Sequence, residues 1–367
     1  MTSDTRRYDI DWLRVVAIGL LLIYHIAIVF QPWGVFIGFI QSDRSLESLW
    51  IPMSMLNVWR IPLLFFVSGM GVGFASRKRN LKQLIIERTR RIFVPFIFGL
   101  FFIVPIHLLI WQKYYHQEMV YSPGPGHLWF LANIFLYVIL LSPLLINLKN
   151  RENGKARKFI NRVFSHPAGL VLITLCFMAE AEILNPETFA AYALSLHGFI
   201  LGFLAFFFGY MCIISGEQFW LNVEKLRWFT VIFPIILFII RYTVFDLNAP
   251  YFMMAIESCS WIFSLLGFGY RYLNHPGPML SYLSQGAYPV YILHMIFLYL
   301  GSFFILPMQI PIFFKFLLLL VFTLGGCILV YELVVRRLNL LRPLFGLKTV
   351  ISQNSINQNK LQKNEKQ

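Results

Sequence analysis

The residues best placed to do chemistry are an arginine and a histidine near the start of the chain. Arg14 and His25 lie eleven residues apart in an apolar stretch. On a helix, this spacing is three turns plus about 20°, so both side chains project from one face, about 16 Å apart along the axis. An imidazole titrates near neutral pH and can take a proton from a hydroxyl and return it to a leaving group. The spacing therefore indicates a cation and a general base on one helix face. The alternative for His25 is a packing histidine that hydrogen-bonds a neighbouring helix.

Further ionisable residues interrupt the other apolar stretches. Within a bilayer each costs about 2.5–3.5 kcal/mol on insertion scales, and such residues usually mark functional sites or pathways. They are Arg60, His107, His197, Arg241, Glu257, His294 and Glu332. A hydrogen-bonded packing role explains His197, and a position near the membrane interface explains His107 and Glu332.

The composition indicates an integral membrane protein. Hydrophobic residues make up 58% of the 367 residues and charged residues only 13%, whereas a soluble globular chain has about 25% charged residues. The net charge of +14 falls mainly between apolar stretches, as in cytoplasmic loops, which argues against nucleic-acid binding. The four cysteines are scattered and show no CxxC spacing, so neither they nor any other motif indicates a bound metal.

A transmembrane helix needs about 20 mostly apolar residues, and the chain contains about ten such stretches. We therefore predict an all-α, polytopic transmembrane helical bundle whose membrane domain covers residues 6–340. The polar segment 350–367 is predicted to be a disordered cytoplasmic tail. The ten predicted spans are 10–31, 50–76, 92–112, 127–147, 167–184, 192–215, 228–246, 250–272, 282–305 and 312–335. The first is longer than the apolar region of a cleavable signal peptide and is followed by Gln31-Pro32-Trp33-Gly34 rather than a small-residue cleavage site, so we expect it to be retained.

The basic residues predict the orientation of the chain in the membrane. Lysines and arginines gather in 77–91, in 149–162 and after the last span, while the alternate loops hold only Arg44 and Lys113. Basic loops remain in the cytoplasm. An even number of spans then places both termini on the cytoplasmic side, in a cell membrane, with a bacterial inner membrane expected.

Several motifs occur together in a fixed order. They are Tyr8-Asp9-Ile10-Asp11-Trp12-Leu13-Arg14 with Tyr24-His25, Trp59-Arg60-Ile61-Pro62, Arg88-Thr89-Arg90-Arg91, Gly126-His127-Leu128-Trp129-Phe130-Leu131 and Tyr288-Pro289-Val290-Tyr291-Ile292-Leu293-His294. This set, over about residues 6–335, resembles the acyltransferase-3 family of membrane proteins, whose first helix carries an Arg/Lys-x10-His motif. The closest resemblance is to the branch containing glucan biosynthesis protein C, which is associated with succinylation of periplasmic glucans.

The resemblance implies transfer of an acyl group from coenzyme A in the cytoplasm to a glycan on the outer side. Arg14, Arg88 and Arg91 would then bind the phosphates of acetyl-CoA or succinyl-CoA, the donor substrate, through charge-assisted hydrogen bonds. His25 would be the general base, with Arg14 and Arg60 as further catalytic residues. The oxyanion donor stays open between Arg60, Tyr24 and Asn133.

The acceptor side of the expected site is less constrained. Glu257, Arg241, His294 and Trp129 are predicted to bind the carbohydrate, although interfacial aromatic residues also occur without ligands. A covalent acyl-enzyme on His25 or Ser68 is an alternative route.

Two other functional classes stay open. One is a transporter or flippase for a glycan or small anion, because buried charges also line transport paths. The other is a regulatory membrane component without chemistry. Between acetyl and succinyl, a cation on the outer side such as Arg60 or Arg241 would suit the additional carboxylate of succinyl.

Overall fold

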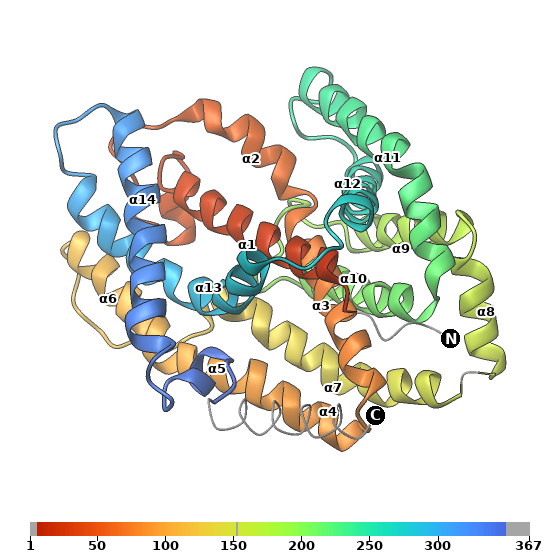
Figure 1. Cartoon of the computed structure of the whole chain (residues 1–367). Coiled ribbons are helices and arrows are strands. Elements are labelled where there is room, and N and C mark those ends of the chain that lie inside the picture. Colours follow the sequence, from red (N-terminus) through yellow and green to blue (C-terminus); the bar gives the residue numbers. More distant parts are fainter. Residues whose placement is uncertain (1–5, 152, 350–367) are drawn as a thin grey trace. The chain divides into compact units, whose positions relative to one another are not determined.

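The computed structural model describes residues 6–151 and 153–349, and this part of the chain is helical and has no strand (Figure 1). The predicted tail, 350–367, lies outside the described residues. The helices are α1 (Tyr8–Ile28), α2 (Trp50–Asn57), α3 (Arg60–Arg77), α4 (Leu81–Arg88), α5 (Val94–Phe98), α6 (Val104–Tyr114), α7 (Trp129–Asn150), α8 (Lys155–Phe164), α9 (Ala168–Leu184), α10 (Leu196–Ile214), α11 (Glu217–Thr243), α12 (Tyr251–Tyr272), α13 (Pro278–Ile305) and α14 (Ile312–Val330). The predicted all-α class is confirmed.

Every one of the ten predicted spans overlaps a helix, but the described residues contain only eight helices long and apolar enough to cross a membrane. The pair α8 and α9, bent by 97°, would be a ninth. The bend falls at His166-Pro167, because proline disfavours a helical conformation of the residue before it. The polytopic helical membrane class is therefore confirmed, and the count of ten is not.

The first of two compact units holds the described residues up to Ala27, then Glu47–Ile85 and Asn133–Ser284. Its central contact joins α3 to α10. Gly69 lies against the backbone of Phe206, and Gly209 lies against the backbone of Phe66, so a Cβ at either glycine would collide with a carbonyl oxygen. Small residues that let two backbones approach closely are typical of helix packing in membranes.

The second unit comprises Ile28–Leu46, Ile86–Ala132 and the described residues from Gln285 onward. Three π-helical turns interrupt its helices: η3 (Thr89–Phe93), η4 (Gly99–Ile103) and η6 (Tyr331–Val335). Such turns occur frequently at functional sites. Within this unit α13 packs on α14, where Gly326 lies against the ring of Phe297.

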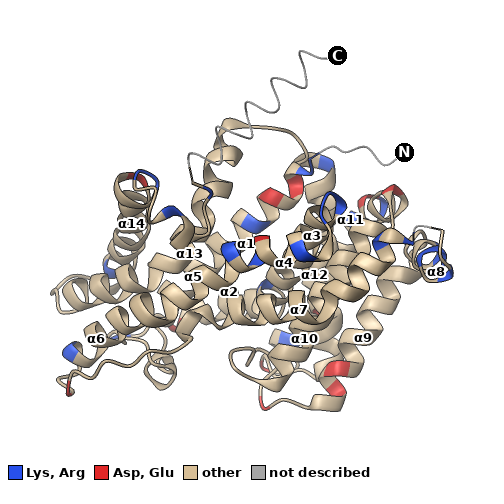
Figure 2. Ribbon diagram, turned by 90° about the horizontal axis from the view of Figure 1, so that it is seen from below, with Lys and Arg blue, Asp and Glu red and all other residues tan. Residues whose placement is uncertain are grey.

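The charged residues are confined to few parts of the helices. Figure 2 shows most helical turns without Lys, Arg, Asp or Glu, whereas basic residues gather on α8. By contrast, α14 exposes large apolar side chains, among them Phe313, Val321 and Leu329. An apolar surface of this kind is expected of a helix that faces lipid.

Candidate active site

The Arg14 side chain lies near the start of α1, in the first unit. Its Nη1 is 3.3 Å from Oδ1 of Asp11, one turn earlier, and its side chain remains 36% exposed. On the other side it approaches α3, since a Cβ built on Gly71 would lie 3.4 Å from its Nη2. Arg14 therefore occupies the seam between α1 and α3. Its counter-ion Asp11 was not predicted, although the i, i+3 spacing of the two charges was available in the sequence.

His25 lies in the last turn of α1 and is partly buried. The residue before it, Tyr24, is buried and presents its ring to Arg60 of α3, whose guanidinium carbon is 3.6 Å from the ring centroid. Arg60 therefore lies at the end of α1 that carries His25.

Arg60 is a buried cation without an acidic partner among the described residues. Only 4% of it is exposed, and its Nε and Nη1 have no hydrogen-bond partner in this part of the chain. The indole nitrogen of the adjacent Trp59 is also buried and lacks such a partner. Burial of an unpaired charge is costly, so these donors suit a ligand that carries an oxyanion, a carbonyl oxygen or a carboxylate.

Arg241 and Glu257, both predicted to bind the acceptor, are instead bonded to each other. Arg241 Nε donates to Glu257 Oε2 at 2.7 Å, and Arg241 Nη2 donates to Glu257 Oε1 at 3.0 Å and to the Ser54 carbonyl at 3.1 Å. Both side chains are fully buried. This bidentate pair ties α11 to α12 and to α2, and such a contact stabilises the unit without any ligand.

His197 has the packing role that the sequence indicated. Its Nδ1 lies 2.9 Å from Glu180 Oε1, and its Nε2 lies 2.9 Å from the carbonyl oxygen of Phe189. Both ring nitrogens are therefore engaged, and the residue is buried.

Two of the three predicted donor-binding arginines, Arg88 and Arg91, belong to the second unit, where both contact Glu87. Arg88 Nε is 3.0 Å from Glu87 Oε2, and Arg91 Nη1 is 3.2 Å from Glu87 Oε1. Arg91 is half exposed, whereas Arg88 is largely buried. They flank the start of the π-helical turn η3, which begins directly after Arg88.

His294 is fully buried in the second unit among other aromatic side chains. Its Nδ1 lies 2.6 Å from the Tyr291 carbonyl oxygen, and its ring centroid lies 4.9 Å from that of His127. The His107 ring lies 5.6 Å from His127 and 5.0 Å from Tyr299. His107 is thus buried among aromatic rings, and His127 was not among the predicted candidates. The described residues contain no group of His, Cys, Asp or Glu suited to hold a metal ion.

Trp129 begins α7 two residues after His127 and is half buried. Its ring lies 6.3 Å from that of Phe130, which in turn lies 6.4 Å from Tyr291. The His-Leu-Trp-Phe-Leu motif therefore carries both Trp129 and the histidine beside His294. That motif was the sequence signal from which His127 could have been chosen.

Comparison with known proteins agrees with these motifs. Residues 7–332 match the model of the acyltransferase domain of the acyltransferase-3 family. Because the match covers most of the chain, this protein belongs to that family of membrane acyltransferases. No curated protein and no solved structure matches the chain.

Proposed function

We propose that the chain is an O-acyltransferase that moves an acetyl or succinyl group from cytoplasmic acyl-CoA to a carbohydrate hydroxyl on the extracytoplasmic side of the cell membrane. Family membership supports acyl transfer in general. The observation that carries the proposal is the Arg60 guanidinium, which is buried without an acidic partner in the described chain against Tyr24, the neighbour of His25. The proposed general base is thus one residue away from a side chain that contacts a buried cation.

His25 acts as the general base. It takes the proton of the acceptor hydroxyl as the oxygen attacks the thioester carbonyl, a contribution typically worth about 10²–10⁴-fold. The carbonyl oxygen becomes an oxyanion, which the Arg60 N–H groups stabilise. Collapse breaks the carbon–sulfur bond, and the imidazolium returns the proton to the departing thiolate. The products are a carbohydrate ester and free coenzyme A.

The other predicted residues divide between the two substrates. Arg14, with Arg88 and Arg91, contributes the positive charge that attracts the coenzyme A phosphates. His294 and Trp129 are proposed to serve the acceptor.

A covalent route through Ser68 has little support from its surroundings. The Ser68 hydroxyl donates to the Leu64 carbonyl of its own helix at 2.7 Å, which is a common way for serine to satisfy its hydroxyl inside a helix. We therefore favour direct transfer assisted by His25.

The test is acceptor-dependent thiol release from acetyl-CoA and succinyl-CoA by the purified full-length protein, with a panel of glycan acceptors. His25→Ala is expected to lower the rate by about 10²–10⁴-fold. His166→Ala provides the matched control, because His166 is exposed on the connection between α8 and α9.

The assay also separates the alternatives. If folded wild-type protein releases no thiol but moves a labelled glycan across proteoliposomes without a donor, the chain is a transporter and the proposal fails. If His25→Ala retains full activity, the enzyme class stands and the role of His25 does not.

A further inference from the structure

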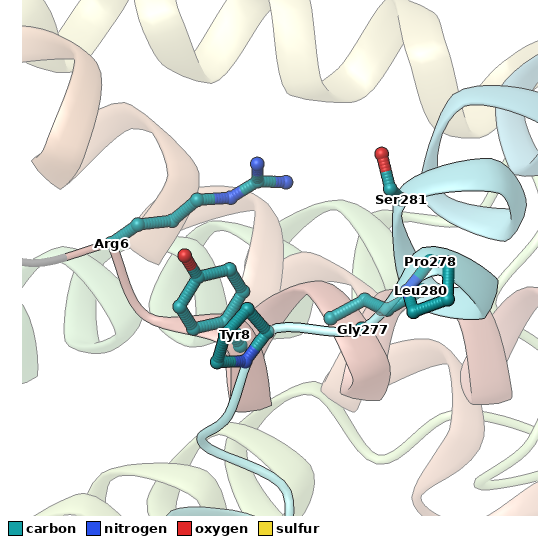
Figure 3. Close-up of a pocket in the computed structure, with 7 residues that line it drawn as sticks. Arg6, Tyr8, Gly277, Pro278, Leu280 and Ser281 are labelled. Carbon is teal, nitrogen blue, oxygen red and sulfur yellow. The ribbon is translucent and has the colours of Figure 1, made fainter.

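A pocket of about 400 Å³ lies at the start of α1 and α13, within the first unit. Its lining comes from the start of α1 and the residue two positions before it, and from the end of the connection between α12 and α13 with the first turn of α13. The lining residues are Arg6, Tyr8, Pro276, Gly277, Pro278, Leu280 and Ser281. Figure 3 shows the Arg6 guanidinium and the Ser281 hydroxyl facing the same space, with the Tyr8 ring beside it. The volume falls in the range of small-ligand sites and would fit one nucleotide but not the whole of coenzyme A.

The chemistry of the lining suits a phosphate beside a flat ring. Arg6 is 57% exposed and offers more N–H donors than the two that bond to Asp11, and guanidinium groups bind phosphate oxygens well. Opposite it, α13 runs from Pro278 for 28 residues, and its first N–H groups and positive dipole end favour an anion. The Tyr8 ring and the prolines provide apolar surface for a base.

The N-terminal segment is held against this connection. The Tyr8 backbone N–H donates to the Asn274 side-chain oxygen at 3.0 Å. Nearby, Arg7 is ion-paired with the buried Asp9, and its guanidinium carbon lies 3.7 Å from the Trp220 ring centroid. These contacts fix the position of Arg6 at the pocket.

The pocket is also linked to the Arg-x10-His motif. Asp11 bonds to Arg6 through Oδ2, at 2.8 Å from Nη2, and to Arg14 through Oδ1, at 3.3 Å from Nη1. One carboxylate therefore joins the arginine of the pocket to the arginine that shares a helix face with His25. A ligand held at Arg6 lies at the Arg14 end of that face.

We infer that this pocket binds the nucleotide end of the acyl donor, adenosine 3′,5′-bisphosphate in chemical terms, so that the pantetheine arm extends along α1 toward His25. The inference rests on the proposed function and adds a binding site for it. Tyr8 and the prolines contact the adenine, while Arg6 and the start of α13 bind the 3′-phosphate, and the other phosphates are left to the arginines proposed above.

The first test measures binding directly and needs no turnover. Adenosine 3′,5′-bisphosphate is titrated into full-length protein in detergent by calorimetry. Arg6→Gln is expected to weaken binding about tenfold or more. Gly277→Leu should abolish it by filling the pocket, since a Cβ on Gly277 meets no atom within 4 Å. Arg162→Gln, an exposed arginine of α8 outside the pocket, should bind as the wild type does.

The second test uses two donors that share the same thioester. With acyl-CoA, Arg6→Gln and Gly277→Leu should raise KM about tenfold or more and leave kcat unchanged. With the matching acyl-pantetheine, which lacks the nucleotide, both variants should equal the wild type. A variant with a structural defect would instead show impaired transfer from both acyl-CoA and acyl-pantetheine.

Several results would overturn the inference. One is equal binding of the nucleotide by the wild type and all three variants. Another is that the wild type binds inorganic phosphate as tightly as it binds the nucleotide. A third is competition by phosphatidylglycerol in nanodiscs, which would assign the pocket to a lipid headgroup. If the wild type releases thiol and the pocket variants behave as the wild type does in both tests, the proposed function stands and the inference about the pocket fails. If no thiol is released, the titration still decides whether the pocket binds the nucleotide.

Discussion

At the scale of single residues, the surroundings of the buried arginines separate two roles that look identical in the sequence. Arg60 and Arg241 both interrupt apolar helices. Arg241 is neutralised by Glu257 at 2.7 Å, whereas Arg60 lies beside Tyr24 and Tyr192 and has no acidic partner in the described chain. A charge kept buried without compensation costs stability, and it is therefore the one of the two that is expected to serve catalysis.

The first prediction concerns Arg60. Arg60→Met is expected to lower kcat/KM for acyl transfer by about 10²–10³-fold, the usual cost of losing an oxyanion donor. The midpoint temperature of thermal unfolding of this variant should equal or exceed that of the wild type, because an apolar side chain replaces a buried charge without an acidic partner. Thiol release and tryptophan fluorescence during heating measure the two effects, with Arg60→Lys as the charge-conserving control. If Arg60→Met loses thermal stability to an extent that explains its loss of activity, the role of Arg60 is structural.

At the scale of the helices, two kinds of contact hold the first unit together. One is the close backbone approach of α3 and α10 at Gly69 and Gly209. The other is the pair of Arg241 on α11 with Glu257 on α12, which also reaches the Ser54 carbonyl on α2. Since α3 carries Arg60 and lies beside Arg14 of α1, these contacts help to position both arginines.

The second prediction follows from the pair of α11 and α12. Arg241→Met should lower the free energy of unfolding by about 3–5 kcal/mol, because it leaves Glu257 buried without a cation. The double variant Arg241→Met/Glu257→Met should recover most of that loss. Thermal or denaturant unfolding in detergent measures both. Unchanged stability together with a raised KM for the glycan would instead assign the pair to acceptor binding.

At the scale of the whole molecule, the distribution of charge predicts how the chain lies in the membrane. Basic residues gather on α8 and around α4, while Lys113 is in the last turn of α6 and the connection after that helix, 115–125, has no Lys or Arg. Positive charge is retained in the cytoplasm, so these two groups of segments should lie on opposite sides.

The third prediction tests this orientation with single cysteines at exposed positions. In intact cells, a maleimide that does not cross membranes should label Arg44→Cys and Glu118→Cys, and it should label Arg151→Cys only after lysis. The unsubstituted chain controls for the four native cysteines. Labelling of Arg151→Cys in intact cells would reverse the predicted orientation.

The membrane class and the helical periodicity were predictable, because both depend on the types and spacing of residues within one stretch of sequence. Low charge and high apolar content define a membrane protein whatever the packing, and helical periodicity alone puts Arg14 and His25 on one face. The exact number of spans was not predictable in this way. A bend at His166-Pro167 leaves α9 with only 17 residues, and α11, which contains most of the predicted span 228–246, is not among the eight helices either.

Only the tertiary structure shows which buried ionisable residues are satisfied by a partner from another segment. Arg241 finds Glu257 sixteen positions later, His197 finds Glu180 seventeen positions earlier, and the lining of the pocket joins residues 6–8 to residues 276–281. Whether a buried charge is satisfied depends on atoms that other segments bring within about 3 Å, and no local pattern reports that distance. The sequence by itself therefore determined the class of protein and the Arg14–His25 face, while the packing of the helices singled out Arg60.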